Sequence, residues 1–131
     1  MFRKLRQGKV NFVTTAELFQ SLTCQLDGTK PSYILAELND LLTAAAGDQF
    51  ESLPGPSIDD PYFANYVAAM VELAAHLRGV RPPAWTSGIE PLSQPVFAVP
   101  WQSLRAHLLL ESPVPFRRRN IFINSSIGAR V

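Results

Sequence analysis

The residues that could carry out chemistry in this chain are few and stand far apart. The 131 residues include one cysteine, Cys24, and two histidines, His76 and His107. A thiol activated by a nearby histidine is a nucleophile, and histidine and cysteine together bind zinc. Here no histidine is near Cys24 in the sequence, and one cysteine with two histidines cannot complete an ordinary structural zinc site. We therefore predict no metal site and expect Cys24 to be a buried structural thiol.

The adjacent carboxylates Asp59 and Asp60 could bind a metal ion, but a helix start explains them more simply. Asp60 precedes Pro61, and this pair is typical of an N-cap followed by the first helical residue. The sequence contains no glycine-rich phosphate-binding motif, no GxSxG and no HExxH. An enzyme would need Asp59 and Asp60 to converge with His76. We predict that the protein is not an enzyme, has no catalytic residues and needs no cofactor.

A run of arginines is the strongest candidate for a binding site. Arg117, Arg118 and Arg119 follow Phe116 and a proline-rich approach. Guanidinium groups bind carboxylates and phosphates through paired hydrogen bonds. Consecutive side chains cannot all face one way, so we expect one arginine to pair with an internal acid or with carbonyl groups. The other two should be exposed, with Phe116 as an apolar anchor for the partner.

The net charge of +1 conceals three segments of different sign. Residues 1–9 sum to +4, residues 10–77 to −8 and residues 78–131 to +5, which together give +1. Salt screens exposed charges beyond about 8–10 Å, so a partner meets each segment separately. Two interpretations stay open: the basic ends fold back onto the acidic middle, or they bind an acidic partner or a nucleic acid.

The pattern of apolar residues predicts three longer helices. The first follows Thr14 or Thr15 and stops at Gly28; one apolar face carries Leu18, Leu22 and Leu26 with Phe19 alongside. The second runs over 32–46, and a loop over 48–58 follows it. The third runs over 61–78 and ends at Gly79.

The chain changes character after residue 80, where seven of the eleven prolines lie between Pro82 and Pro115. Trp85 and Trp101 in this region favour an ordered strap packed over the helices, with both indoles as packing residues. A short helix over 100–111 interrupts the strap. The β-branched residues of 120–124 predict a strand, and the obvious mate is residues 10–13.

These features predict a mainly α fold: a compact single-domain helical bundle over 1–131, with a proline-rich irregular strap and a small two-stranded β element. A basic arm (1–13) precedes a three-helix core (14–79), and the strap, the short helix and the basic C-terminal segment follow (80–131). No apolar run approaches eighteen residues and no targeting signal is recognisable, so we expect a cytoplasmic protein without membrane contact.

Three stretches of the C-terminal third carry a family resemblance: PPAW at 82–85, LRA at 104–106 and ESPVPFRRRNIFI at 111–123. In these the chain resembles small uncharacterised bacterial helical proteins found beside toxin–antitoxin-type or mobile-element genes. The resemblance brings no catalytic residue, and it implies an antitoxin-like component that acts through a protein partner.

The expected function is therefore that of a non-catalytic binding protein, most concretely antitoxin-like, which binds a protein partner through its basic C-terminal segment. The alternative is a nucleic-acid-binding regulator that uses the basic segments at both ends of the chain. A helix-turn-helix built from the first two helices is disfavoured, because Glu37 and Asp40 would face the phosphates.

Overall fold

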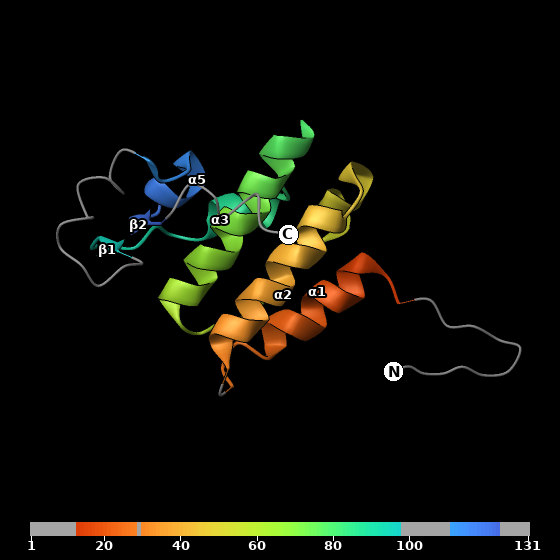
Figure 1. The fold of residues 1–131 in the computed structure, drawn as a ribbon, viewed down its shortest axis with the longest axis horizontal. Helices are drawn as coiled ribbons and strands as arrows, with labels where there is room; N and C mark the ends of the chain where they lie inside the picture. The colour runs from red at the N-terminus through yellow and green to blue at the C-terminus, as the bar shows by residue number, and fades with distance from the viewer. Residues whose placement is uncertain (1–12, 29, 98–110, 124–131) are drawn as a thin grey trace, which may run out of the picture.

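A computed structural model describes residues 13–28, 30–97 and 111–123, and it is mainly helical. Three α-helices, α1 (Thr15–Cys24), α2 (Pro31–Ala44) and α3 (Pro61–Arg78), provide most of the core. Figure 1 shows α3 between the α1–α2 pair on one side and helix α5 (Val114–Arg117) with strand β2 (Ile121–Phe122) on the other. The predicted mainly α fold with a two-stranded sheet is confirmed.

Helix α1 starts where the sequence predicts but ends at Cys24 rather than at Gly28. Of the predicted apolar face, Phe19 is buried and Leu22 is half-buried. Thr14 is the N-cap: its Oγ1 accepts a hydrogen bond from the Glu17 amide (3.1 Å), and Glu17 Oε1 accepts one from the Thr14 amide (2.9 Å). The face turned to the core carries Phe19 and Thr23, whereas Leu18 is 42% exposed. Neighbouring helical positions differ by about 100°, so this face turns Cys24 outward. The prediction of a buried Cys24 is wrong, because the thiol is exposed.

Helix α3 agrees with its predicted boundaries. Asp60 Oδ1 accepts a hydrogen bond from the Tyr62 amide at 2.8 Å, and Pro61 is the first helical residue. Gly79 ends the helix with a φ of 71°, a left-handed conformation that glycine adopts without a Cβ penalty. Burial of Tyr66 on this helix, with a smaller repulsion from Tyr62, raises the pKa of Tyr66 to about 12.

The other helix boundaries differ from the predictions. Helix α2 spans Pro31–Ala44 rather than 32–46, and the 3₁₀ helix η1 (Gly47–Ser52) occupies part of the predicted loop. Arg78, at the end of α3, reaches across to the end of α2. Its guanidinium donates to the carbonyl groups of Ala45 (3.1 Å), Leu42 (3.2 Å) and Thr43. It therefore caps carbonyls that α2 itself leaves without an intrahelical donor.

The proline-rich strap begins with the 3₁₀ helix η2 (Ala84–Gly88), which carries Trp85. The indole Nε1 donates to the Leu53 carbonyl at 2.9 Å, and its ring centroid lies 6.1 Å from that of Phe19. Gly55 lies directly against the ring, since a Cβ there would be 3.2 Å from Trp85 Cγ. Trp85 is thus a packing residue as predicted, whereas Trp101, His107 and the predicted helix 100–111 lie outside the described residues, apart from Glu111.

The C-terminal segment consists of helix α5 (Val114–Arg117) and strand β2 (Ile121–Phe122). Strand β2 pairs in parallel with β1 (Val96–Phe97), with Val96 opposite Ile121 and Phe97 opposite Phe122. The sequence did not predict β1 as this mate; of the mate it did predict, residues 10–13, only Val13 is among the described residues. The strap brings β1 beside β2, and the rings of Phe97 and Phe122 stack with their centroids 5.1 Å apart.

Candidate binding groove

Arg119 is the arginine that faces the protein. It is 5% exposed and lies between α3 and the segment that follows η2. Its Nε and Nη2 donate to the two carboxylate oxygens of Glu72 at 3.3 and 2.9 Å. This is a bidentate pair with an acid of the acidic middle segment, which confirms the prediction of one internal arginine.

The remaining guanidinium hydrogens of Arg119 also have acceptors. Nη1 donates to Asn65 Oδ1 and to the Ile89 carbonyl, both at 3.0 Å, and Nη2 donates to the Thr86 carbonyl at 2.6 Å. Asn65 in turn donates to the carbonyls of Pro61 (2.9 Å) and Glu90 (3.0 Å). Each of the five N–H donors of the guanidinium therefore has a partner. The network fixes the C-terminal segment to α3 and to the strap.

The conformation around Arg119 is set by its neighbours. Asn120 has a φ of 66°, which asparagine tolerates better than most residues, and its Nδ2 donates to the Leu92 carbonyl at 2.6 Å. The Asn120 carbonyl accepts from the Val96 amide at 2.8 Å. This turn sends Arg119 inward and leads the chain directly into β2.

The other predicted site residues have three different environments. Arg118 projects outward, with a side chain that is 65% exposed. Arg117 is half-buried rather than exposed as expected. Phe116 is 0% exposed and packs edge-on against Tyr66, with ring centroids 5.2 Å apart. The prediction of Phe116 as a partner's anchor is therefore corrected, because burial between α5 and α3 makes the ring part of the core.

Two hollows in the surface meet at Arg118. One, of about 330 Å³, is lined by residues of the strap that include Ile89 and Pro91. The other, of about 400 Å³, is lined by residues that include Val114 and Pro115. Glu72 and Arg118 border both hollows, so we treat the two as one groove and call it the Arg118 groove. Each hollow is of the size that holds small ligands or single side chains.

The charge in the Arg118 groove is unevenly shared. Arg119 occupies both oxygens of Glu72 at hydrogen-bond distance, whereas Arg118 Nη2 lies 3.7 Å from Glu72 Oε1, beyond hydrogen-bond range. One carboxylate thus faces two guanidinium groups, and the three groups sum to +1. The uncompensated positive charge belongs to the exposed Arg118.

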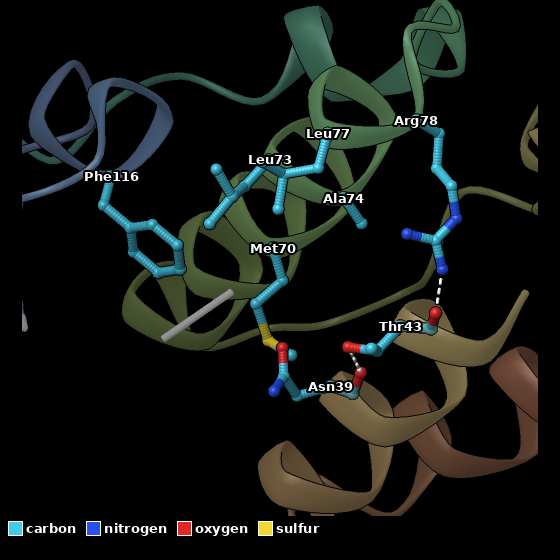
Figure 2. Close-up of a pocket in the computed structure, with 8 residues that line it drawn as sticks. All are labelled: Asn39, Thr43, Met70, Leu73, Ala74, Leu77, Arg78 and Phe116. Atoms are coloured by element: carbon cyan, nitrogen blue, oxygen red, sulfur yellow. Dashed lines mark hydrogen bonds between the residues drawn. The ribbon is translucent and has the colours of Figure 1, made fainter. Parts of the chain in front are cut away.

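A separate cavity between α2, α3 and α5 is too small for a ligand. Figure 2 shows its lining, with Asn39 and Thr43 from α2 below the α3 residues and Phe116 to one side. Its volume of about 10 Å³ is close to the space that one water molecule needs. Asn39 is 7% exposed, and its Nδ2 has no hydrogen-bond partner among the described residues. This cavity concerns stability rather than ligand binding.

The residues considered for catalysis are not brought together. Asp60 caps the start of α3 and His76 lies sixteen residues further on, about 24 Å along the helix axis. Within the described parts of the chain, no three His, Cys, Asp or Glu side chains are grouped closely enough to hold a metal ion. Cys24 lies in another surface hollow, at the connection between α1 and α2, which Lys30 and Tyr33 also line.

Comparisons with known proteins identify no relative. No protein-family model, curated protein or solved structure matches the chain. Among the described helices, none is long and apolar enough to cross a membrane. The function must therefore be inferred from the Arg118 groove itself.

Proposed function

We propose that this chain is a non-catalytic binding protein that acts through a protein partner, and that the Arg118 groove is where the partner binds. One observation carries the proposal: the guanidinium of Arg118 is 65% exposed and borders two hollows. Its positive charge is not compensated, because Glu72 is already paired with Arg119. Interfaces are enriched in arginine at the sites that contribute most to binding. Apolar side chains on both sides of Arg118 add the contact area that such a site needs.

The resemblance of the C-terminal third to small bacterial proteins beside toxin–antitoxin-type genes makes an antitoxin-like component the most specific form of this proposal. The stretch that carries the resemblance, 111–123, supplies Arg118, Val114 and Pro115 to the groove. Under this proposal the basic residues of that stretch divide their roles: Arg119 holds the fold and Arg118 contacts the partner.

A protein partner agrees better with the groove than a nucleic acid does. Nucleic-acid affinity grows with the number of cations that reach phosphates. In the arginine run, Arg119 is committed internally, Arg117 is half-buried and Arg118 alone is largely exposed. The carboxylate of Glu72 also borders the groove, so Arg118, Arg119 and Glu72 together leave a charge of only +1 for a phosphate chain. A nucleic-acid complex is thus the alternative outcome of the experiment.

The test is photo-crosslinking from inside the groove in cells that express the protein. A photoreactive phenylalanine analogue replaces Val114, which is 52% exposed and lines the groove. The matched control places it at Tyr33, which is 61% exposed in the hollow between α1 and α2. We expect one discrete protein adduct from position 114, identified by mass spectrometry, that is absent from position 33 and lost when Arg118→Glu is added.

Three results would contradict the proposal. An adduct with nucleic acid at position 114 would favour the regulator. The same adducts from both positions would show contact without a specific site, and a protein adduct that persists in the Arg118→Glu variant would remove Arg118 from the interface.

A further inference from the structure

We infer that the Arg118 groove recognises a peptide segment in which one carboxylate side chain is flanked on both sides by apolar side chains. This rests on the proposed function, because it specifies the chemistry of the partner at the same site. The inference comes from the groups that line the groove. Apolar side chains border Arg118 in both hollows, together with Ser87 in one hollow and His76 in the other.

The cationic centre is preorganised by Arg119. Because Arg119 holds both oxygens of Glu72 in a buried network, the carboxylate is fixed below Arg118 and is already neutralised. Arg118 therefore keeps donors for an external acceptor while it stays beside Glu72 at 3.7 Å. A planar guanidinium with available donors matches a carboxylate, to which it binds through two parallel hydrogen bonds.

The walls on either side are apolar and stiff. Ile89 and Pro91 line one hollow, and Val114 and Pro115 line the other. Proline has a fixed φ, so these walls lose little freedom when a ligand binds. Val114 is 52% exposed, which leaves apolar surface for a partner's side chain to cover. Two apolar walls on either side of one cation therefore match a peptide in which an acidic residue lies between two apolar residues.

The charge of the groove favours a carboxylate over a phosphate. A phosphorylated side chain carries nearly two negative charges, and the sites that bind it cluster several cations around it. Here Arg118 is the one largely exposed guanidinium among the residues that line the groove, and with Arg119 and Glu72 it sums to only +1; the imidazole of His76 also lines one hollow. A single negative charge cancels that sum, whereas a second negative charge would exceed it.

The experiment titrates the isotope-labelled full chain with the tripeptide N-acetyl-Leu-Glu-Leu-amide and follows the methyl signals of Ile89, Val80 and Val114 by NMR. All three residues border the groove. Two matched probes replace the central glutamate by glutamine and by phosphoserine. We expect saturable shifts of these signals with the glutamate peptide and about tenfold weaker binding of the glutamine peptide, since the charge-assisted bond is lost.

Two variants locate the effect. Arg118→Gln should lower the affinity for the glutamate peptide about tenfold and leave the affinity for the glutamine peptide unchanged. Lys30→Gln removes the same charge from the hollow between α1 and α2 and should change the affinity by less than about twofold, because screening limits its reach to about 8 Å. A spectrum that stays otherwise unchanged shows that each variant is folded.

The inference is overturned if the glutamine peptide binds as well as the glutamate peptide, if phosphoserine binds more tightly, or if no groove signal moves. If one of these titration results is found and a protein is still crosslinked at position 114, the proposed function stands. Only the inference that the groove recognises a carboxylate side chain is then refuted. Absence of the crosslink refutes the proposed function itself, whatever the tripeptides do.

Discussion

Arg119 and Arg118 are adjacent in the sequence and opposite in role. Arg119 donates five hydrogen bonds to acceptors inside the molecule, whereas the side chain of Arg118 is 65% exposed. The difference arises because consecutive side chains project in different directions and the turn at Asn120 fixes which one points inward. Substitution at the two positions should therefore separate folding from binding.

We expect Arg119→Ala to lower the free energy of unfolding by about 3–5 kcal/mol, because the largely buried Glu72 carboxylate loses its hydrogen-bonded cation and keeps only the exposed Arg118 at 3.7 Å. Arg119→Lys keeps the charge but offers three donors for five acceptor contacts, so it should lose about 1–3 kcal/mol. Arg118→Ala, at a 65% exposed side chain, should change stability by no more than about 0.5 kcal/mol. Urea unfolding measures the free energy of unfolding of all three variants. Equal losses of stability in Arg118→Ala and Arg119→Ala would disprove the separation of a binding role from a folding role.

Tyr66 gives the chain a specific response to alkali. Its pKa rises from 10.0 to about 12 in the folded state, mainly through burial. Between these two pH values the unfolded chain loses the phenol proton and the folded chain keeps it, so unfolding is favoured as the pH rises. The free energy of unfolding should fall by up to about 1.4 kcal/mol per pH unit in this interval.

The measurement compares urea unfolding at pH 9.5 to 12 for the natural chain and for Tyr66→Phe. The phenylalanine variant has no phenol to titrate, so its stability should fall less steeply over this interval. Parallel curves for the two proteins would show that Tyr66 does not contribute to the alkaline loss.

At the scale of elements, the ends of the helices determine how they join. Arg78 stands at the C-terminal end of α3 and donates to carbonyls at the C-terminal end of α2. A cation is favourable there for both helix dipoles. One side chain thus sets the relative position of two helices whose apolar faces also contact each other.

We expect Arg78→Ala to cost about 1–2 kcal/mol of stability, because it leaves the carbonyls of Leu42 and Ala45 without this donor. Arg81→Ala, at an exposed arginine just beyond the helix, is the control and should stay within about 0.5 kcal/mol. Hydrogen exchange should rise selectively in the last turn of α2. A uniform rise along the whole chain would argue against a local cap.

The sequence predicts elements with strong local signals and fails where the signal comes from distant residues. Helix α3 was predicted because Asp60, Pro61 and Gly79 mark its ends within the helix itself. Strand β2 was predicted, but its pairing with β1 was not, since β1 is two residues long and has no measurable periodicity. The 3₁₀ helix η1 was missed for the same reason, because its two turns are too short to show an amphipathic repeat.

The candidate site was predicted in kind but not in detail. Three adjacent arginines beyond an acidic segment indicate one internal pair, but which arginine forms it depends on α5 and on the positive φ of Asn120. The hollows beside Arg118 could not be predicted, because Ile89 and Val114 are brought to the same guanidinium only by the tertiary fold.

At the scale of the molecule, the C-terminal segment is a part of the core. Phe116 and Ile121 are both 0% exposed, and they belong to one apolar cluster with Phe19 of α1 and Leu38 of α2. If the described parts unfold as one cooperative unit, a defect at Phe116 must lower the stability of α1 and β2 equally. If the C-terminal segment instead unfolds independently, the loss of stability would be confined to α5 and β2.

We expect Phe116→Ala to lower the free energy of unfolding by about 3–5 kcal/mol, since it removes a large side chain from a fully buried position. Native-state hydrogen exchange should then show the same loss for the most protected amides of α1, α2 and β2. Val114→Ala, on the same helix but 52% exposed, should change these values by no more than about 0.5 kcal/mol. If the Phe116 variant loses protection in α5 and β2 while α1 keeps its full value, the C-terminal segment opens separately. The Arg118 groove, which that segment builds together with α3 and the strap, would then exist only in the closed fraction of molecules.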